Sequence, residues 1–303
     1  MNISYTGSGK VYLIAGGGKT YSDIAARFCN SERGVEEIIG SEESLQILHN
    51  LVNSNHTAAL EFDDFIFGIE GYSRVTEAQL IRKRVGASYM IKSGRIEKHG
   101  KRSFDVVIPE SIKDFNSVVK LNPDNLSLYL NTKRDPDGED VTSVRSLRST
   151  LEEYLPEHTT FDAVYYNYTA LDILEMIENW YRIGSDEYNR KEEDLRYLKP
   201  QATEFKACIK MNAAGLRDWF QKRLCNRAQF EIRDLAWQMY KKCCRAVPAL
   251  FDDAGAYCKV LGYCPENERQ CSFMKGYIPT KEEAKKLLKD WKKLKVAEEN
   301  KEE

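Results

Sequence analysis

"NAAGLRDWFQKRLCNRAQFEIRDLAWQMYKKCCRAV", residues 212–247, is the stretch that decides the fold. Its apolar residues recur at helical spacing and the pattern stops before Pro248, so it predicts helix, with 212–234 treated as one helix. The preceding "ATEFKACIKMN" (202–212) alternates apolar and polar residues, which predicts a strand. The two patterns together favour a central sheet with long helices.

Polar side chains are mixed into the apolar pattern of the predicted helix. They are Asp218, Arg223, Arg227, Gln229, Glu231 and Arg233. Arg223 and Arg227 lie four residues apart and therefore share a face on adjacent turns. Burial of such groups without a partner costs free energy, so some of them must face a cleft or another subunit.

The rest of the chain has strands mostly early and helices mostly late. Strands are predicted at 10–16, 60–71 and 102–112, and helices at 20–31, 35–54, 77–84 and 168–198. The fold class is therefore α/β, of the mixed α+β kind. We predict one domain over residues 1–280, with a helical insertion around 140–193, and a charged helical tail over 281–303.

The composition limits the possible functions. The 303 residues include 45 basic and 47 acidic side chains, so a protein that coats nucleic acid is excluded and any anion site is local. No run approaches the ~20 apolar residues of a membrane span, and no secretion signal is recognisable. Eight cysteines without such a signal favour reduced thiols or metal ligands over disulfides, and the expected compartment is the cytoplasm.

"GGGKT", residues 16–20, resembles the end of a phosphate-binding P-loop. That motif also requires a glycine five positions before Gly18, where this chain has Leu13. The pattern therefore predicts a turn after a strand, and an NTPase is excluded.

"RKRVGASYMIKSGR", residues 82–95, gathers positive charge around small residues. Arg82, Lys83, Arg84 and Arg95 surround Ser88, Ser93 and Gly94. Guanidinium groups bind phosphate through paired planar hydrogen bonds, and a glycine lets the backbone approach an anion. Alone, the stretch fits either a solvated loop or a phosphate site.

Four stretches together carry a family resemblance. Residues 82–95 are similar to a signature of Arg-His-Arg, seven further residues, a serine and then Gly/Thr-Arg. Residues 212–236 are similar to a second signature, Asn-x-Arg-x-Leu-x-x-Phe…Arg followed by Ala-Gln-x-Glu-Ile-Arg. "LRYLKP" (195–200) matches an Arg-x-x-Leu-Pro element in Arg196 and Pro200, and 56–84 resembles the lead-in His-x-x-x-x-Glu-His…Phe, then Ser-Arg and Gln. Covering most of 56–107 and 195–275 in the right order, these elements resemble the flavin-dependent thymidylate synthase family.

The resemblance implies a homotetramer with active sites shared between subunits. It implies bound FAD reduced by NADPH, methylenetetrahydrofolate as carbon donor, and methyl transfer to C5 of dUMP. By position, the dUMP residues would be Gln79, Ser93, Gly94, Arg95, Arg196 and Arg223, with Arg223 stabilising charge on the pyrimidine. The FAD residues would be Arg82, Lys83, Arg84, Asn212, Asp218 and Arg227.

The chain departs from the family pattern mainly on the flavin side. Lys83 replaces the central histidine, Gly86 is an extra residue, and Phe62 replaces the histidine of the Glu-His pair. Ala214 replaces a flavin-contacting arginine, and Asp218 a common Asn or His. Two alternatives therefore stay open: a divergent enzyme that uses another pyrimidine nucleotide or performs C5 hydroxymethylation, and a non-catalytic nucleotide-binding homologue.

The late cysteines suggest a metal site. Cys258, Cys264 and Cys271 follow the helix containing Cys225, and four thiols could hold a structural zinc ion. No pair has C-x2-C spacing, so reduced buried thiols remain the alternative. As a further alternative the basic patch could dock RNA or an acidic protein, which the near-neutral total charge disfavours.

Overall fold

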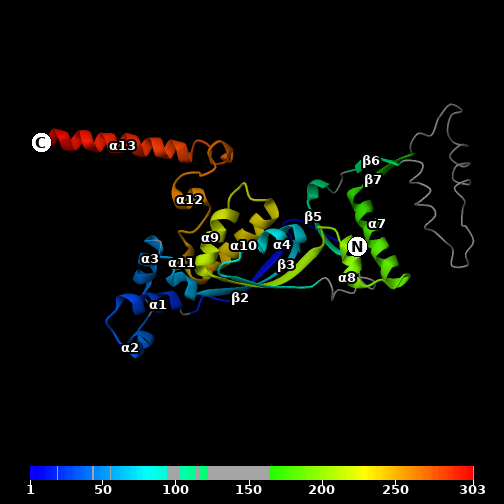
Figure 1. Cartoon of the computed structure of the whole chain (residues 1–303), viewed down its shortest axis with the longest axis horizontal. Coiled ribbons are helices and arrows are strands. Elements are labelled where there is room, and N and C mark those ends of the chain that lie inside the picture. Colours follow the sequence, from blue (N-terminus) through cyan, green and yellow to red (C-terminus); the bar gives the residue numbers. More distant parts are fainter. Residues whose placement is uncertain are drawn as a thin grey trace, which may run out of the picture.

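The computed structural model describes most of the chain (Figure 1). The described residues are 1–18, 20–42, 44–54, 56–93, 103–112, 116–121 and 164–302. The predicted dUMP residues Gly94 and Arg95 and part of the predicted insertion, 140–163, lie outside them.

A four-stranded antiparallel sheet forms the centre, in the order β2 (Lys10–Ala15), β3 (Asp64–Ser73), β8 (Glu204–Asn212) and β4 (Ala87–Ile91). In β3 and β8 alternate residues are buried, because side chains of a strand point to opposite faces. Both strands were predicted from this alternation. The strand β4 was not, since it lies within the basic stretch, which was interpreted by its charge.

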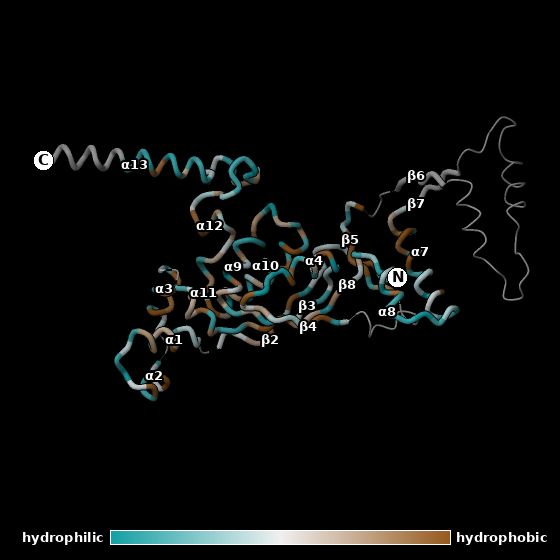
Figure 2. Tube along the Cα trace, in the orientation of Figure 1, coloured by the Kyte–Doolittle hydropathy of each residue, from teal (hydrophilic) through white to brown (hydrophobic). Residues whose placement is uncertain are grey.

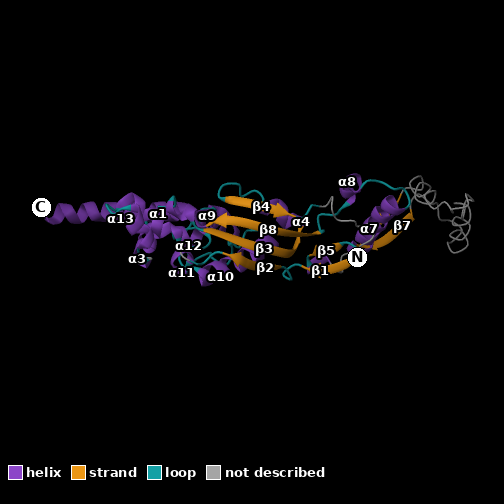
Figure 3. Ribbon diagram, turned by 90° about the horizontal axis from the view of Figure 1, so that it is seen from below, coloured by secondary structure: helices purple, strands orange, loops and turns teal. Residues whose placement is uncertain are grey.

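Helices cover one face of this sheet: α4 (Arg74–Leu80), α9 (Ala213–Arg223), α10 (Phe230–Ala246) and α11 (Pro248–Phe251) (Figures 1 and 3). The main hydrophobic core lies between these helices and the sheet. The prediction of one helix over 212–234 was wrong. The chain leaves α9 after Arg223, and the side chain of Gln229 accepts hydrogen bonds from two backbone N–H groups of α10, so that a second helix begins there.

Three short helices precede β3. They are α1 (Tyr21–Asn30), α2 (Val35–Gly40) and α3 (Leu45–Asn53), followed by the 3₁₀ turn η1 (Ala59–Phe62). The predicted helix over 35–54 is therefore interrupted by residues 41–44. Contacts of α1 with η1, and of α3 with α11, hold this group against the end of the sheet.

A second, smaller core lies at the other end of the sheet. There β1 (Asn2–Tyr5) pairs in parallel with β5 (Asp105–Ile108), and α7 (Ala170–Asp186) and α8 (Glu192–Leu195) pack beside them. Its buried side chains are Phe104, Val106, Ile108, Leu174, Tyr181 and Leu195. The described part of the predicted helical insertion therefore contains α7, and also a strand, β7 (Val164–Thr169), which pairs with β6 (Asn116–Leu121).

The C-terminal segment contains α12 (Tyr257–Leu261) and α13 (Lys281–Glu302), the predicted tail helix. In Figure 1 α13 extends away from the sheet, and the part of α13 that Figure 2 colours is largely hydrophilic. Among the helices of the described ranges, none is both long and apolar enough to span a bilayer.

Candidate functional site

The end of α4 and the loop after it lie against α9. The Nη1 atom of Arg223 lies 3.3 Å from Oε1 of Gln79, and its Nη2 donates to the Gln79 carbonyl oxygen at 3.2 Å. The ammonium of Lys83 donates to Asp218 at 2.8 Å. We call this cluster the cationic junction; it comprises Gln79, Arg82, Lys83, Asp218, Lys222 and Arg223.

A buried carboxylate brings the two segments together. Glu231, in the first turn of α10, is only 2% exposed and accepts the backbone N–H of Ser73 at 2.6 Å and its hydroxyl at 2.5 Å. Ser73 is the N-cap residue, directly before α4. Sequence reasoning expected polar groups such as Glu231 to face a cleft or a subunit, but this one fixes the start of α4 and thereby positions Gln79.

The extra residue of the basic stretch, Gly86, makes close approach to α9 possible. Its φ is +70°, and a Cβ there would lie 2.5 Å from Oδ1 of Asn212. The Asn212 backbone N–H donates to the Gly86 carbonyl, and its side chain accepts from the N–H of Gly215 at 2.8 Å. Asn212, predicted to bind the flavin, is therefore the N-cap of α9.

Arg82 and Arg223 carry charge that the described chain does not neutralise. Arg223 is half-buried, and burial together with the nearby positive charge of Arg82 lowers the pKa of its guanidinium from the usual value. No carboxylate among the described residues forms an ion pair with either guanidinium. Two neighbouring arginines without a counter-ion have the donor geometry that binds carboxylate or phosphate groups.

The lysines of the junction differ from the arginines. The Asp218 carboxylate accepts hydrogen bonds from both Lys83 and Lys222, each at 2.8 Å. Burial acts to raise the pKa of Asp218, but the hydrogen bonds from Lys222 and Lys83 outweigh it, so the pKa lies below 3.8. Two departures from the family pattern, Lys83 and Asp218, are thus partners in one ion pair.

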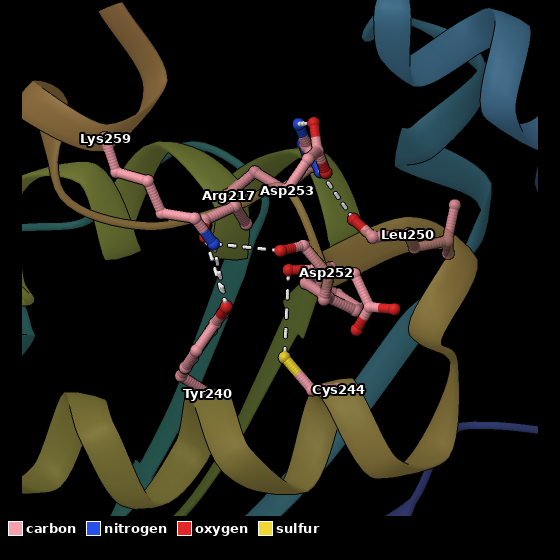
Figure 4. Close-up of polar contacts among 9 residues, drawn as sticks. Arg217, Tyr240, Cys244, Leu250, Asp252, Asp253 and Lys259 are labelled. Carbon is pink, nitrogen blue, oxygen red and sulfur yellow. Dashed lines mark hydrogen bonds and ion pairs between the residues drawn. The ribbon is translucent and has the colours of Figure 1, made fainter. Parts of the chain in front are cut away.

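The opposite side of α9 is anchored to the C-terminal segment (Figure 4). Arg217 binds both carboxylate oxygens of Asp253, at 2.7 and 2.8 Å, and the Leu250 carbonyl oxygen. The ammonium of Lys259 donates to the carbonyl oxygens of Asp252 and Ala254, each at 2.8 Å. The contacts of Arg217 hold α9 to the segment after α11, while Arg223 of the same helix contacts α4.

Other predicted site residues do not join the junction within one chain. Arg196 begins the 3₁₀ turn η4 (Arg196–Leu198) directly after α8, and no side-chain bond between it and the junction is found in the described part of the structure. Arg227 donates to the carbonyl oxygen of Arg269 at 2.6 Å. Arg84 is exposed in the loop before β4, and Ser93 follows that strand.

The arrangement does not support the predicted zinc site. Cys225, Cys258, Cys264 and Cys271 are all described and none is in a disulfide, yet no three His, Cys, Asp or Glu side chains within the described ranges could together hold a metal ion. Burial, with Cys225 and Cys264 nearby, raises the pKa of the Cys258 thiol.

The glycine-rich turn at 16–18 leads to α1, whose first amides are already occupied. Asp63, only 6% exposed, accepts the N–H of Tyr21 at 2.7 Å and the N–H of Ser22 at 3.1 Å, and also binds the Ser22 hydroxyl. The carboxylate takes the place that a phosphate has in a P-loop. The turn is therefore structural, and sequence reasoning did not recognise Asp63.

The comparisons decide the family. A family model described as "Thymidylate synthase complementing protein" matches residues 17–249. A flavin-dependent thymidylate synthase of Nitratidesulfovibrio vulgaris is 32% identical over 231 residues, which cover 76% of each chain. One of Clostridium tetani is 31% identical over 256 residues, 82% of this chain and 86% of the relative.

The chain belongs to the flavin-dependent thymidylate synthase family.

This confirms the family resemblance and the assignment as an enzyme of the FAD-dependent thymidylate synthase type. The cationic junction lies inside the matched residues, whereas Cys258, Cys264, Cys271 and α13 lie beyond them. Among solved structures, the UMP/dUMP methylase PolB from Streptomyces cacaoi, bound with 5-Br dUMP, is similar with a TM-score of 0.56. At 16% identity over 83% of this chain and 96% of that one, it supports the mixed α/β fold alone.

Proposed function

We propose that this member of the flavin-dependent thymidylate synthase family methylates dUMP at C5 reductively, with FAD bound, methylenetetrahydrofolate as carbon donor and NADPH as reductant. One observation carries the proposal. The cationic junction joins residues of both family hallmarks around Arg82 and Arg223, which have no carboxylate partner among the described residues. A mononucleotide and a dinucleotide cofactor both carry phosphate, so each fits such a site.

Arg223 is the catalytic residue in this proposal. Gln79 accepts from one guanidinium nitrogen through its side chain and from the other through its backbone, which orients the group. The remaining donors would bind a carbonyl of the pyrimidine and stabilise the negative charge that develops on the ring. When bound, the flavin supplies the reducing equivalents, and Arg82 with Lys83 and Arg84 would lie along its phosphates.

The other predicted residues remain proposals. Ser93, Gly94, Arg95 and Arg196 would complete the dUMP site, and Asn212, Asp218 and Arg227 would lie on the flavin side. Because Arg196 has no bond to the junction of its own chain in the described structure, we propose that it serves the active site of a neighbouring subunit. The working form would be a homotetramer in the cytoplasm.

The test is the absorbance spectrum of the purified protein, followed by tritium release from C5-labelled dUMP and, separately, UMP. We expect flavin absorbance in the blue and release from dUMP that depends on NADPH and methylenetetrahydrofolate. Arg223→Ala should reduce release by about 10²–10³-fold, the usual effect of removing a donor to developing charge. Arg245→Ala, which removes an exposed arginine from the last turn of α10, is the control.

Three outcomes would contradict parts of the proposal. A colourless protein that still binds dUMP would support the nucleotide-binding homologue. Release from UMP but not dUMP would change the acceptor. A hydroxymethylated product, identified by its mass, would change the transferred group.

A further inference from the structure

The C-terminal end of α4 is bound by side chains from two other elements. The last carbonyl oxygens of an α-helix have no partner within the helix itself. Here the Gln79 carbonyl accepts from Arg223 of α9 at 3.2 Å, and the Leu80 carbonyl oxygen lies 3.0 Å from the hydroxyl oxygen of Tyr89 on β4. The same hydroxyl lies 2.5 Å from the carbonyl oxygen of Lys83. Tyr89 therefore binds both ends of the turn that follows α4, residues 80–83.

Tyr89 is held by the central sheet. The strand β4 forms one edge of this sheet (Figure 3), and there Tyr89 pairs with the fully buried Ile209 of β8. The Tyr89 side chain packs against the main hydrophobic core. Burial raises the pKa of Tyr89 to about 12, so the hydroxyl keeps its proton at neutral pH and can donate it. A rigid strand thus fixes the backbone of a turn that lies outside the sheet.

The hydroxyl has a single hydrogen to share between two carbonyl oxygens. The shorter distance favours the Lys83 carbonyl, which accepts no other hydrogen bond within the described residues. The Leu80 carbonyl has a second partner, because it also accepts the Lys83 backbone N–H at 3.2 Å. Loss of the Tyr89 hydroxyl would therefore leave the far end of the turn without its support.

The turn that Tyr89 holds carries Arg82. The positive charge of Arg82 is near enough to Arg223 to contribute to the lowered pKa of that guanidinium. Like charges repel, and neither arginine is paired with a carboxylate in the described part of the chain. Repulsion therefore favours conformations in which the turn moves Arg82 away, and a support outside the turn is needed to oppose it.

We propose that Tyr89 is a positioning residue, whose hydroxyl holds the turn 80–83 in the conformation that keeps Arg82 beside Arg223 before any ligand binds. A site formed in advance spares the ligand the cost of ordering the turn, so affinity rises without a new contact. Tyr89 acts through the backbone of the turn. The inference rests on the proposed function in one respect: it takes the phosphates of FAD as the anion that Arg82 meets.

The first experiment follows amide hydrogen exchange by mass spectrometry in the full chain without ligand. Tyr89→Phe removes only the hydroxyl, and the amides of Ile81 and Lys83, bonded to the carbonyls of Glu77 and Leu80, report on the turn. We expect them to exchange about tenfold faster, the effect of losing one hydrogen bond. Unchanged exchange would overturn the proposal.

Tyr240→Phe is the matched control for both experiments. Tyr240 is also half-buried, and its hydroxyl lies 3.2 Å from the Ala254 carbonyl oxygen, outside the cationic junction. It loses the same group and the same kind of contact, so it should leave the exchange of the turn and the affinity for FAD at parental values.

The second experiment measures the dissociation constant of FAD by quenching of flavin fluorescence. Tyr89→Phe should raise it about tenfold. In an Arg82→Gln background, where the repulsion is absent, the same substitution should raise it less than about twofold. An equal factor in both backgrounds would show a general structural role and overturn the proposal. A parent that binds no FAD would contradict the proposed function instead, and the exchange experiment would then decide the role of Tyr89.

Discussion

The turn before α1 and the cationic junction both have the residues of a phosphate site, yet they differ in what neutralises them. At the turn, the amides of Tyr21 and Ser22 bind the buried carboxylate of Asp63. At the junction, Arg82 and Arg223 lie together with no carboxylate partner in the described part of the chain. The difference teaches that an anion site needs donors that the chain itself leaves unsatisfied.

The same distinction separates two adjacent residues inside the junction. Lys83 is bound to Asp218, which also holds Lys222, so its charge is balanced. Arg82 is exposed and keeps its charge available. We therefore expect Arg82 and Arg223 to supply the unbalanced positive charge for ligands, and Lys83, held by Asp218, to lie beside the flavin phosphates as a balanced group.

The largest expected effect on stability comes from removing the Asp63 carboxylate that binds the first amides of α1. Asp63→Ala leaves two backbone N–H groups and a hydroxyl without their acceptor, so we expect the free energy of unfolding to fall by about 3 kcal/mol. Equilibrium unfolding in urea measures this free energy. The control is Glu37→Gln in α2, which removes the carboxylate of an exposed ion pair with Arg33. It should change the free energy of unfolding by less than about 0.5 kcal/mol. Equal losses for the two variants would show that Asp63 is not an internal substitute for an anion.

The second prediction makes the junction resemble the turn. Gln79→Glu places a carboxylate next to Arg223 with almost no change of shape. We expect dUMP affinity to fall at least about tenfold, since a charge-assisted contact contributes about 1.5–3 kcal/mol, while the melting temperature stays equal or rises. Calorimetric titration measures the affinity, with Gln46→Glu on the exposed side of α3 as control. Unchanged affinity would remove Arg223 from the nucleotide site.

The smallest effect concerns the Lys83–Asp218 pair. A double-mutant cycle with Lys83→Met and Asp218→Asn should give a coupling of about 0.5 kcal/mol, because Asp218 is partly exposed and solvent screens the pair. The folded-state pKa of Asp218 is lowered, so its contribution is complete above 3.8 and is lost as pH falls through the lowered pKa. Unfolding measured from pH 7 down into the acid range below 3.8 checks this; a coupling that did not decrease as pH falls through that range would contradict the ion pair.

Sequence reasoning predicted several elements for physical reasons that are local. The alternation of β3 and β8 and the helical spacing of α1, α9 and α10 report which side of each element is buried, whereas α13 was predicted from its charge. The missing glycine at Leu13 excluded a P-loop. The break between α9 and α10 was missed because the cap formed by Gln229 lies within a pattern that remains helical on either side.

Sequence reasoning named residues that lie together in the junction, but it did not predict which of them bind each other. The motifs indicated Gln79, Arg82, Lys83, Asp218 and Arg223, and the structure brings these five together. Lys83 and Asp218 were treated as two independent departures from the family pattern, although they bind each other. Gly86 was interpreted as an insertion, although its positive φ and missing side chain allow the loop to meet Asn212.

By itself the sequence determined the family, the strands and helices with strong periodicity, and the residue types available for an anion site. These depend on spacing over a few residues, which a linear chain displays directly. Only the tertiary structure decided which charges are balanced, since Lys83 meets Asp218 across 135 residues and Ser73 meets Glu231 across 158. Whether a charged group binds a ligand or its own chain depends on such distant contacts, and local periodicity carries no information about them.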